Sequence, residues 1–306
     1  MRVLAIFNKW WECDPGIAAL INQNGRPAGL PWPVSLAGIK QRPDRAALPP
    51  ENPAPLARAI FYMKRFYVEL WCISDLLEHL EDKPNFQSST QRKAGYMGKI
   101  FRGESPGLVV ALGTAGCPDA RSENGNVVVG TKCFIHDPNG EASNPDSQWN
   151  VGPFDRIIDS SLSADSFKKI CGIPKASARF LLPPLNPADA PRVLAEYPNV
   201  GLSGVNVTDY AKYAQADSDT LSAFNKLNSG LPAKSLETTH GLIRSQSSAP
   251  FLFISGITDR VGYFDTEVQP RPYAQNTVAA YNAGIVLGEI LAAMDSAEVA
   301  DFKTPM

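Results

Sequence analysis

The sequence has little that would suit it to a polyanion or a membrane. Its 306 residues carry 29 Lys and Arg against 31 Asp and Glu, a formal net charge of -2, whereas proteins that bind nucleic acid or anionic lipid usually have a basic excess. No apolar run approaches the roughly 20 residues of a membrane-spanning helix. The apolar stretch in the N-terminal "MRVLAIFNKWWE" is too short for a signal peptide. We therefore expect a cytoplasmic protein with no nucleic-acid partner and no membrane partner.

Cysteine and histidine are scarce and scattered. The cysteines are odd in number and have no CxxC spacing, which argues against a disulfide framework and against a zinc site. The three histidines form no His-x-x-x-His pair, so we expect no metal site. We predict that the cysteines are small core side chains. The five are Cys13, Cys72, Cys117, Cys133 and Cys171.

Short apolar runs alternate with helix-like stretches, the pattern of an α/β fold with a largely parallel sheet. A stripe of apolar residues every three or four positions predicts a helix over 56–80, and a second apolar helix is expected over 276–294. In that second helix Ala280, Gly284 and Gly288 would let it lie close to a sheet or another helix. The predicted strands are 2–7, 107–113, 126–135, 200–207 and 251–257.

Residues 27–55 differ from the rest in composition. They hold eight prolines (27, 31, 33, 43, 49, 50, 53 and 55) and no sustained periodicity, which predicts an irregular surface insertion. We find no internal repeat and no linker that clearly divides two domains. The sequence therefore predicts a single domain over 1–306 with a proline-rich insertion.

Two segments at strand ends are candidates for a site, because open α/β sheets bind ligands at the carboxyl ends of their strands. "ALGTAGCPD" (111–119) places Thr114, Ala115 and Gly116 after an apolar run. Taken alone, this segment is first interpreted as a simple tight turn, and the alternative is a site where small residues allow a ligand to approach the backbone. "FLFISGITDR" (251–260) ends in Asp259, which taken alone could also be a helix cap or turn residue.

Taken in order, these segments resemble the nucleoside phosphorylase and nucleosidase superfamily. "LVVALGTAGCPDARSENGNVVVGTKCFIHD" (108–137) is similar to its strand, glycine turn and following strand. "FLFISGITDR" with "AAYNAGIVLGEIL" is similar to its catalytic segment and final helix, and "KSLETTHGLI" (234–243) to its Met-Glu ribose segment, with Leu236 in place of Met and Glu237 retained. The resemblance covers about half of the chain and fails over 138–199 and much of 14–107.

The resemblance implies a three-layer α/β sandwich with a mixed, twisted central sheet. It also implies a homodimer or higher homo-oligomer that cleaves the N-glycosidic bond of a small-molecule nucleoside, in first place a purine nucleoside, without a cofactor. Cleavage requires a proton for the departing base, stabilisation of the cationic sugar and a nucleophile at the anomeric carbon.

The resemblance assigns these tasks to particular residues. Asp259 would protonate or hydrogen-bond N7 of the purine, and Glu237, beside Leu236, would accept hydrogen bonds from the ribose hydroxyls. Thr114 would lie close to the nucleophile, and Tyr210 would stack beneath the base, although core packing accounts for Tyr210 equally well.

The nucleophile is left open between water and phosphate. The phosphorylases carry a GxPxR-type phosphate segment after the first strand, and this chain has "FNKWWECDPG" instead. Glu12 in that segment would position an attacking water, or would be a solvated loop charge. Hydrolysis is the first expectation and phosphorolysis, with phosphate as co-substrate, the alternative. A third reading is a protein of the same fold that binds a nucleoside without cleaving it.

Overall fold

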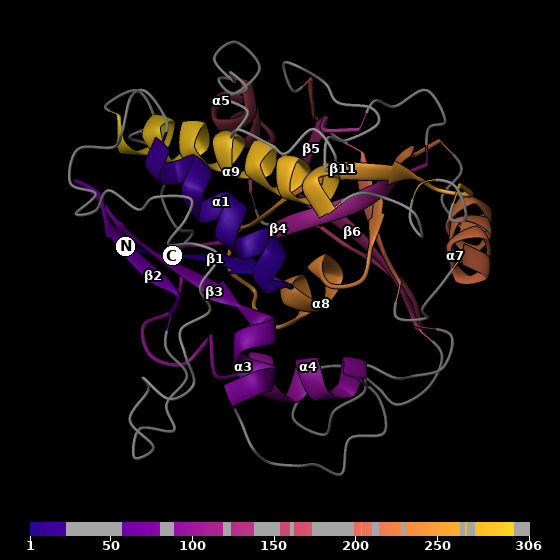
Figure 1. The fold of residues 1–306 in the computed structure, drawn as a ribbon, viewed down its shortest axis with the longest axis horizontal. Helices are drawn as coiled ribbons and strands as arrows, with labels where there is room; N and C mark the ends of the chain where they lie inside the picture. The colour runs from indigo at the N-terminus through magenta and orange to yellow at the C-terminus, as the bar shows by residue number, and fades with distance from the viewer. Residues whose placement is uncertain are drawn as a thin grey trace.

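The computed structural model describes residues 1–22, 57–79, 89–118, 124–137, 154–159, 162–172, 199–202, 204–209, 214–227, 230–263, 267 and 273–296, and Figure 1 labels their helices and strands. The insertion predicted at 27–55 and the candidate residue Tyr210 lie outside these residues.

The described strands form one mixed sheet of 11 strands, ordered β2-β3-β1-β4-β10-β9-β6-β7, with β11 joining β4 to β5 and β5 joining β8. Pairs such as β1 with β4 are parallel, and pairs such as β11 with β5 are antiparallel. The strands are β1 Arg2–Phe7, β2 Ala59–Tyr62, β3 Tyr67–Cys72, β4 Leu108–Cys117, β5 Val127–Gly130, β6 Lys132–Asp137, β7 Phe154–Ile158, β8 Val200–Leu202, β9 Val205–Asp209, β10 Ala233–Glu237 and β11 Phe251–Arg260.

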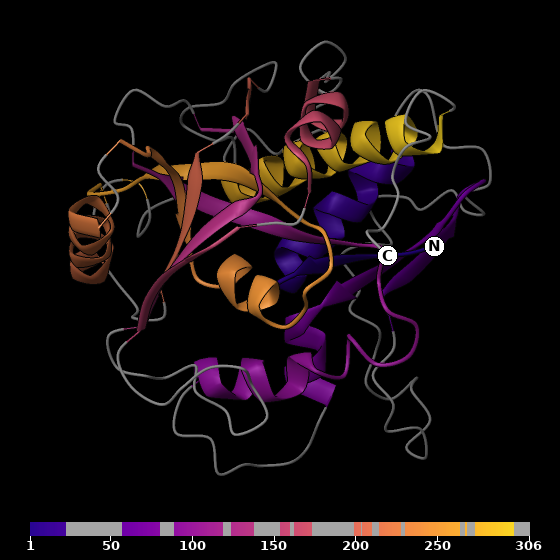
Figure 2. The same ribbon diagram turned by 180° about the vertical axis from the view of Figure 1, so that it is seen from behind.

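Helices cover both faces of this sheet. In Figures 1 and 2, α1 and α9 lie side by side on one face, whereas α3, α4 and α8 lie on the other. The helices are α1 Trp10–Asn22, α3 Ile73–His79, α4 Ser89–Met97, α5 Ala164–Gly172, α7 Ala214–Leu227, α8 His240–Ser245 and α9 Tyr273–Asp295. The predicted three-layer α/β sandwich with a mixed central sheet is confirmed.

The alternation of side chains along the strands explains why helices cover both faces of the sheet. Successive side chains of a strand point to opposite faces of its sheet. In β1, Val3, Ala5 and Phe7 enter the core beneath α1 and α9, while Leu4 and Ile6 enter the core beneath α3, α4 and α8. All of β1 is buried, because a central strand of a three-layer fold has no solvent-facing side.

The contact between α9 and α1 depends on small residues, as the sequence predicted. A Cβ at Gly284 would lie 2.5 Å from the carbonyl oxygen of Gly16, so only glycine lets the two helices approach this closely. The most apolar 18-residue window of α9 would suit a membrane by composition, yet 83% of it is buried. It is therefore packed as a core helix.

The predicted helix over 56–80 is wrong over most of its length. That segment forms the antiparallel strands β2 and β3, and a helix begins only at Ile73. "AIFY" and "YVELWC" consist largely of β-branched and aromatic residues, which suit a strand. Pairing of β3 with β1 buries that strand in the sheet, and this tertiary pairing outweighs the helical spacing of the apolar residues.

Two predicted strands are each divided in two. The run 126–135 becomes β5 and β6, which pair with different neighbours, and 200–207 becomes β8 and β9. Gly204 separates β8 from β9 with a φ of +101°, a left-handed conformation that glycine adopts without steric cost. Small breaks of this kind inside apolar runs are not visible in hydrophobicity alone.

Candidate functional site

The candidate residues meet where β4 changes its neighbour in the sheet. β1 accompanies β4 in parallel as far as Phe7 and Leu112, and β10 pairs with β4 further on, in the antiparallel direction, at Leu236 and Gly116. Gly113, Thr114, Ala115 and Gly116 lie within β4, so the first interpretation of this segment, a tight turn, is wrong. This stretch of strand is the frame on which the site is built.

Glu12 approaches this frame from the first turn of α1. It is 4% exposed, so it is neither in a loop nor a solvated charge. Its Oε1 accepts hydrogen bonds from the backbone N–H (2.9 Å) and the hydroxyl (2.7 Å) of Thr114, and its Oε2 accepts the backbone N–H of Lys9 at 2.9 Å. The carboxylate is therefore fixed between its own helix and β4.

Gly113 provides the space for this carboxylate. A Cβ at Gly113 would lie 3.1 Å from Glu12 Oε1, so any side chain there would press against it. Burial raises the pKa of Glu12, and the hydrogen bonds from Thr114 and Lys9, with the charge of His240, act in the opposite direction. A buried carboxylate with a raised pKa is suited to proton transfer near neutral pH.

Glu237 ends β10 and is held by the turn that follows it. Its Oε1 accepts the hydroxyl of Thr208 at 2.6 Å and the backbone N–H of His240 at 2.8 Å, and its Oε2 accepts the backbone N–H of Thr239. Because β10 runs antiparallel to β4, the chain beyond Glu237 returns along β4 toward Gly113. The two glutamates thus approach the same stretch of β4.

Sequence reasoning missed Thr208. It is fully buried at the end of β9, and its hydroxyl also lies 2.8 Å from the backbone N–H of Gly241 and 3.0 Å from Asn206 Oδ1. It therefore joins β9, β10 and α8 around the Glu237 carboxylate. The available signal was a polar residue at the carboxyl end of the strand "VNVTD".

Asp259 lies beside the same frame, next to Gly116 in the β11–β4 pairing. It is 7% exposed, and its Oδ1 accepts the hydroxyl of Thr258 at 2.5 Å. A Cβ at Gly116 would lie 3.1 Å from Asp259 Oδ2, so glycine leaves this carboxylate its space. Arg260, the neighbour of Asp259, donates to Glu267 Oε1 at 2.6 Å and stacks on Tyr263.

The remaining candidates, Leu236 and Ala115, have side chains that lie in the hydrophobic core. Leu236 is buried in a cluster with Phe134 and Phe224, and Ala115 is buried in the core on the α8 side of the sheet. Their backbones belong to the site, while contact of their side chains with a ligand stays a prediction.

One further group is brought into the site by α8. His240 is 2% exposed, its Nδ1 lies 3.4 Å from the hydroxyl oxygen of Ser255, and its ring stacks on Phe253. The structure places it beside Glu237 and within electrostatic reach of Glu12.

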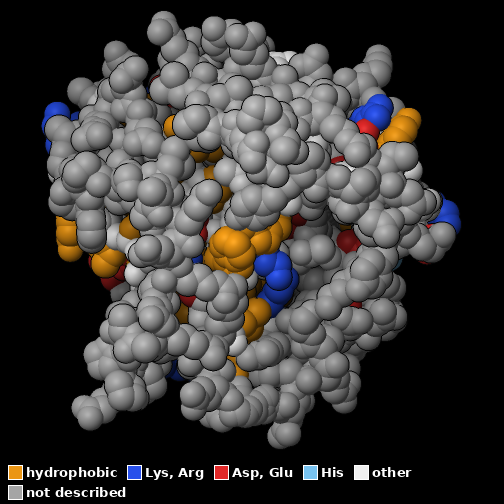
Figure 3. Space-filling view, viewed as in Figure 1, with side chains coloured by type: hydrophobic (Ala, Val, Ile, Leu, Met, Phe, Trp, Pro, Cys, Tyr) orange, Lys and Arg blue, Asp and Glu red, His pale blue; other side chains and the backbone are white. Residues whose placement is uncertain are grey.

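The segment that leads into Glu12 is partly accessible. Residues 8–11 are all intermediate in exposure. Figure 3 shows hydrophobic side chains beside a basic group near the centre of the view, over the region of α1 and α8 in Figure 1. Partly accessible residues therefore immediately precede the buried carboxylate.

Four cysteines, Cys13, Cys72, Cys117 and Cys133, are free and buried, which confirms the prediction of core side chains for them; the side chain of Cys171 lies outside the described part. Within the described part of the chain, no group of three or more His, Cys, Asp and Glu residues could hold a metal ion.

Comparison with known proteins finds similarity in structure alone. No protein-family model and no curated protein matches the sequence. A 5'-methylthioadenosine/S-adenosylhomocysteine nucleosidase from Neisseria meningitidis, in complex with methylthio-immucillin-A, has a TM-score of 0.53 at 14% identity, covering 95% of this chain and 98% of that one.

Two further structures agree. A putative nucleosidase of the same kind from Borrelia burgdorferi, bound to adenine, has a TM-score of 0.54 at 11% identity, covering 94% of this chain and 98% of that one. A futalosine hydrolase mutant of Helicobacter pylori has a TM-score of 0.52 at 10% identity, covering 95% and 98%. The chain therefore has the fold of these nucleosidases.

Proposed function

We propose that this protein cleaves the N-glycosidic bond of a purine nucleoside, with water as the nucleophile. The observation that carries the proposal is the buried carboxylate of Glu12, fixed by Thr114 on the same stretch of β4 that pairs with the strands of Glu237 and Asp259. The fold shared with structurally characterised nucleosidases supports it as an analogy.

The free acceptor positions of the two glutamates suit this reaction. A carboxylate can accept about four hydrogen bonds. Glu12 and Glu237 each accept two at Oε1 and one at Oε2 from described residues. Each Oε2 therefore keeps one position, which Glu12 would use for an O–H of the attacking water and Glu237 for a ribose hydroxyl.

The proposed step balances without a cofactor. A water O–H proton passes to Glu12 as the oxygen bonds to the anomeric carbon, and the bond from that carbon to the base breaks with its electron pair going to the base. Asp259 donates a proton or hydrogen bond to N7 of the departing base. The negative charge of Glu237 stabilises the sugar as it becomes cationic.

The substrate class follows from the same analogy. The Neisseria protein is bound to methylthio-immucillin-A and the Borrelia protein to adenine. We propose an adenine nucleoside as the first candidate substrate. The protein would act in the cytoplasm, as a homodimer or higher homo-oligomer, without metal or organic cofactor.

The direct test is a panel of nucleosides: 5'-methylthioadenosine, S-adenosylhomocysteine, futalosine, adenosine and inosine. Each is incubated with the protein with and without phosphate, and released bases are separated by chromatography. Release that does not depend on phosphate supports hydrolysis. Strict dependence on phosphate identifies a phosphorylase, and binding without release of any base identifies a nucleoside-binding protein.

Substitutions assign the roles on a verified substrate. Asp259→Asn should lower kcat by roughly 10²- to 10⁴-fold, the usual contribution of general acid catalysis, and leave binding measurable by calorimetry. Glu12→Gln should nearly abolish turnover in phosphate-free buffer. The control is Asp165→Asn on the exposed first turn of α5, which should retain full activity. Full activity of Asp259→Asn would contradict the mechanism.

A further inference from the structure

The site holds a buried imidazole that the proposed reaction has not yet used. His240 is 2% exposed and opens α8 directly after the turn that holds Glu237. Its backbone N–H donates to Glu237 at 2.8 Å. Its ring contacts β11 instead, so the main chain and the side chain of His240 serve different partners.

Two contacts orient this ring. It stacks on Phe253 with a centroid distance of 6.1 Å and an interplanar angle of 29°, and its Nδ1 lies 3.4 Å from Ser255 Oγ. Ser255 is fully buried within the apolar run "FLFISGI", and within the described residues its side chain has His240 as its hydrogen-bond partner. A buried hydroxyl costs free energy unless it is hydrogen-bonded, so the contact with His240 explains how a serine is accommodated in this apolar strand.

The same contacts bring the ring to the level of Glu12. Ser255 pairs with Gly113 in the parallel pairing of β11 and β4, and the Glu12 carboxylate lies against Gly113. Burial raises the pKa of Glu12, and the charge of His240 lowers it. Of the groups that oppose the effect of burial on Glu12, His240 is the one that would act through charge rather than through a hydrogen bond.

Other ionisable residues lie on the segments around the pair. Lys9 precedes α1 and contacts Glu12 through its backbone N–H, Glu237 ends β10, and Asp259 lies further along β11 than Ser255. Two of these are carboxylates. A protonated imidazole in this position would add positive charge beside these carboxylates.

We propose that His240 is a positioning residue for the reaction: its imidazole, oriented by Ser255 and Phe253, places positive charge beside Glu12 and keeps that carboxylate ready to accept a proton from water. The inference rests on the proposed function, since it gives Glu12 the role of base. Without His240, Glu12 would hold a proton to higher pH and be inactive over part of the working range.

The first test is the pH dependence of kcat on the substrate identified by the panel. An opposite charge close to a carboxylate shifts its titration by about 1–3 pH units. His240→Gln should therefore move the acidic limb of the kcat profile to higher pH, by about one pH unit or more. At a given pH on that limb kcat should fall roughly 10-fold, with KM little changed. Ser255→Ala should give a smaller shift in the same direction. His136→Gln, which removes another buried histidine, should leave the limb in place.

The second test needs no activity. With three histidines in the chain, ring signals can be assigned in NMR spectra from the His→Gln variants and followed against pH. Coupling between two titrating groups is reciprocal, so Glu12→Gln should move the midpoint of the His240 signals to lower pH and leave those of His136 unchanged.

The two tests separate the possible failures. A wild type that cleaves no nucleoside contradicts the proposed function, while the NMR titration still decides whether His240 and Glu12 are coupled. An active wild type with an unmoved acidic limb in His240→Gln, or an unmoved His240 midpoint in Glu12→Gln, overturns the role of His240 and leaves the hydrolysis standing.

Discussion

At the scale of single residues, the glutamates of the site are held by donors that approach from different parts of the chain. Glu12 is fixed by Thr114 of β4 and by Lys9 of its own turn. Glu237 is fixed by Thr208 of β9 and by the two backbone N–H groups that follow it. Such fixing preorganises both groups before substrate binds.

The raised pKa of Glu12 has a consequence for stability. Because burial raises its pKa in the folded state, the folded protein binds this proton more tightly than the unfolded chain does. The associated stability is present below the unfolded pKa and is lost as the pH rises through the folded value. Relative to Glu12→Gln, the wild type should therefore gain free energy of unfolding as the pH falls through the folded pKa of Glu12 toward its unfolded value.

Urea titrations of both proteins at several pH values check this. The two proteins share every other titrating group, so the difference between their unfolding free energies reports Glu12 together with its coupling to His240, and both contributions have the same sign. A difference that stays constant with pH, or that changes in the opposite direction, would show that the Glu12 pKa is not raised.

The single acceptor position left on Glu237 predicts unequal use of the ribose hydroxyls. With one position free at Oε2, the carboxylate should bind one hydroxyl directly. A hydrogen bond to a charged group contributes roughly 1.5–3 kcal/mol. Removing that hydroxyl should lower kcat/KM by roughly 10- to 100-fold, and removing the other should cost much less.

The measurement compares 2'-deoxy and 3'-deoxy analogues of the verified substrate. In Glu237→Gln the difference between the two analogues should shrink, because the charge that creates it is gone. Equal losses for both analogues in the wild type would show that Glu237 binds the hydroxyls together.

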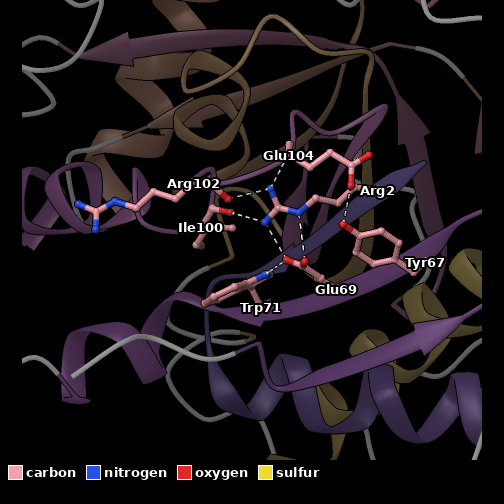
Figure 4. Close-up of polar contacts among 7 residues, drawn as sticks. All are labelled: Arg2, Tyr67, Glu69, Trp71, Ile100, Arg102 and Glu104. Atoms are coloured by element: carbon pink, nitrogen blue, oxygen red, sulfur yellow. Dashed lines mark hydrogen bonds and ion pairs between the residues drawn. The ribbon is translucent and has the colours of Figure 1, made fainter. Parts of the chain in front are cut away.

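At the scale of elements, a buried arginine joins the start of the sheet to the segment after α4. Figure 4 shows Arg2 of β1 among Glu69 of β3 and the backbone carbonyls of Ile100, Arg102 and Glu104. Its guanidinium donates to both Glu69 oxygens, at 3.1 and 2.8 Å, and to the three carbonyls at 2.7–3.1 Å. All five N–H donors of the guanidinium are thereby used.

Arg2→Ala should therefore destabilise the protein strongly. Arg2 is 4% exposed, and removing one partner of a buried, hydrogen-bonded ion pair typically costs about 3–5 kcal/mol. Urea unfolding followed by circular dichroism measures the loss. The matched control, Arg65→Ala at an exposed position in the β2–β3 turn, should change stability by less than about 0.5 kcal/mol. Equal effects of the two substitutions would show that the hydrogen bonds of Arg2 contribute no more stability than an exposed arginine does.

At the scale of the whole molecule, the two main cores share one sheet. Leu4 and Ile6 enter one core while Val3, Ala5 and Phe7 enter the other. Loss of either layer of helices would expose one face of the same central strands. This arrangement favours unfolding as one cooperative unit, in keeping with the predicted single domain.

Chemical unfolding should accordingly show one transition. Far-UV circular dichroism reports the helices and strands. Tryptophan fluorescence reports local packing, including that of Trp71, which is buried in the core beneath α3, α4 and α8. The two signals should have the same midpoint. Separate midpoints, or a plateau between them, would indicate two units that unfold independently.

The sequence determined the α/β class, the long apolar final helix and the position of Asp259 toward the end of a strand, because these depend on local periodicity and on short segments. The strand that ends at Glu237 was not predicted. The sequence could not predict the two strands within 56–80, since the apolar residues there have helical spacing and the pairing of β3 with β1 outweighs it.

Only the tertiary structure decided how the site is assembled. β4 pairs first with β1 and then with β10, and this brings Glu12 to Thr114. The pairing of β10 with β9 brings Glu237 to Thr208, and the pairing of β11 with β4 brings Ser255, with His240 beside it, to the level of Gly113. These contacts join residues far apart in the chain. Their proximity depends on strand order and register, which the packing of the whole molecule fixes and no local pattern encodes.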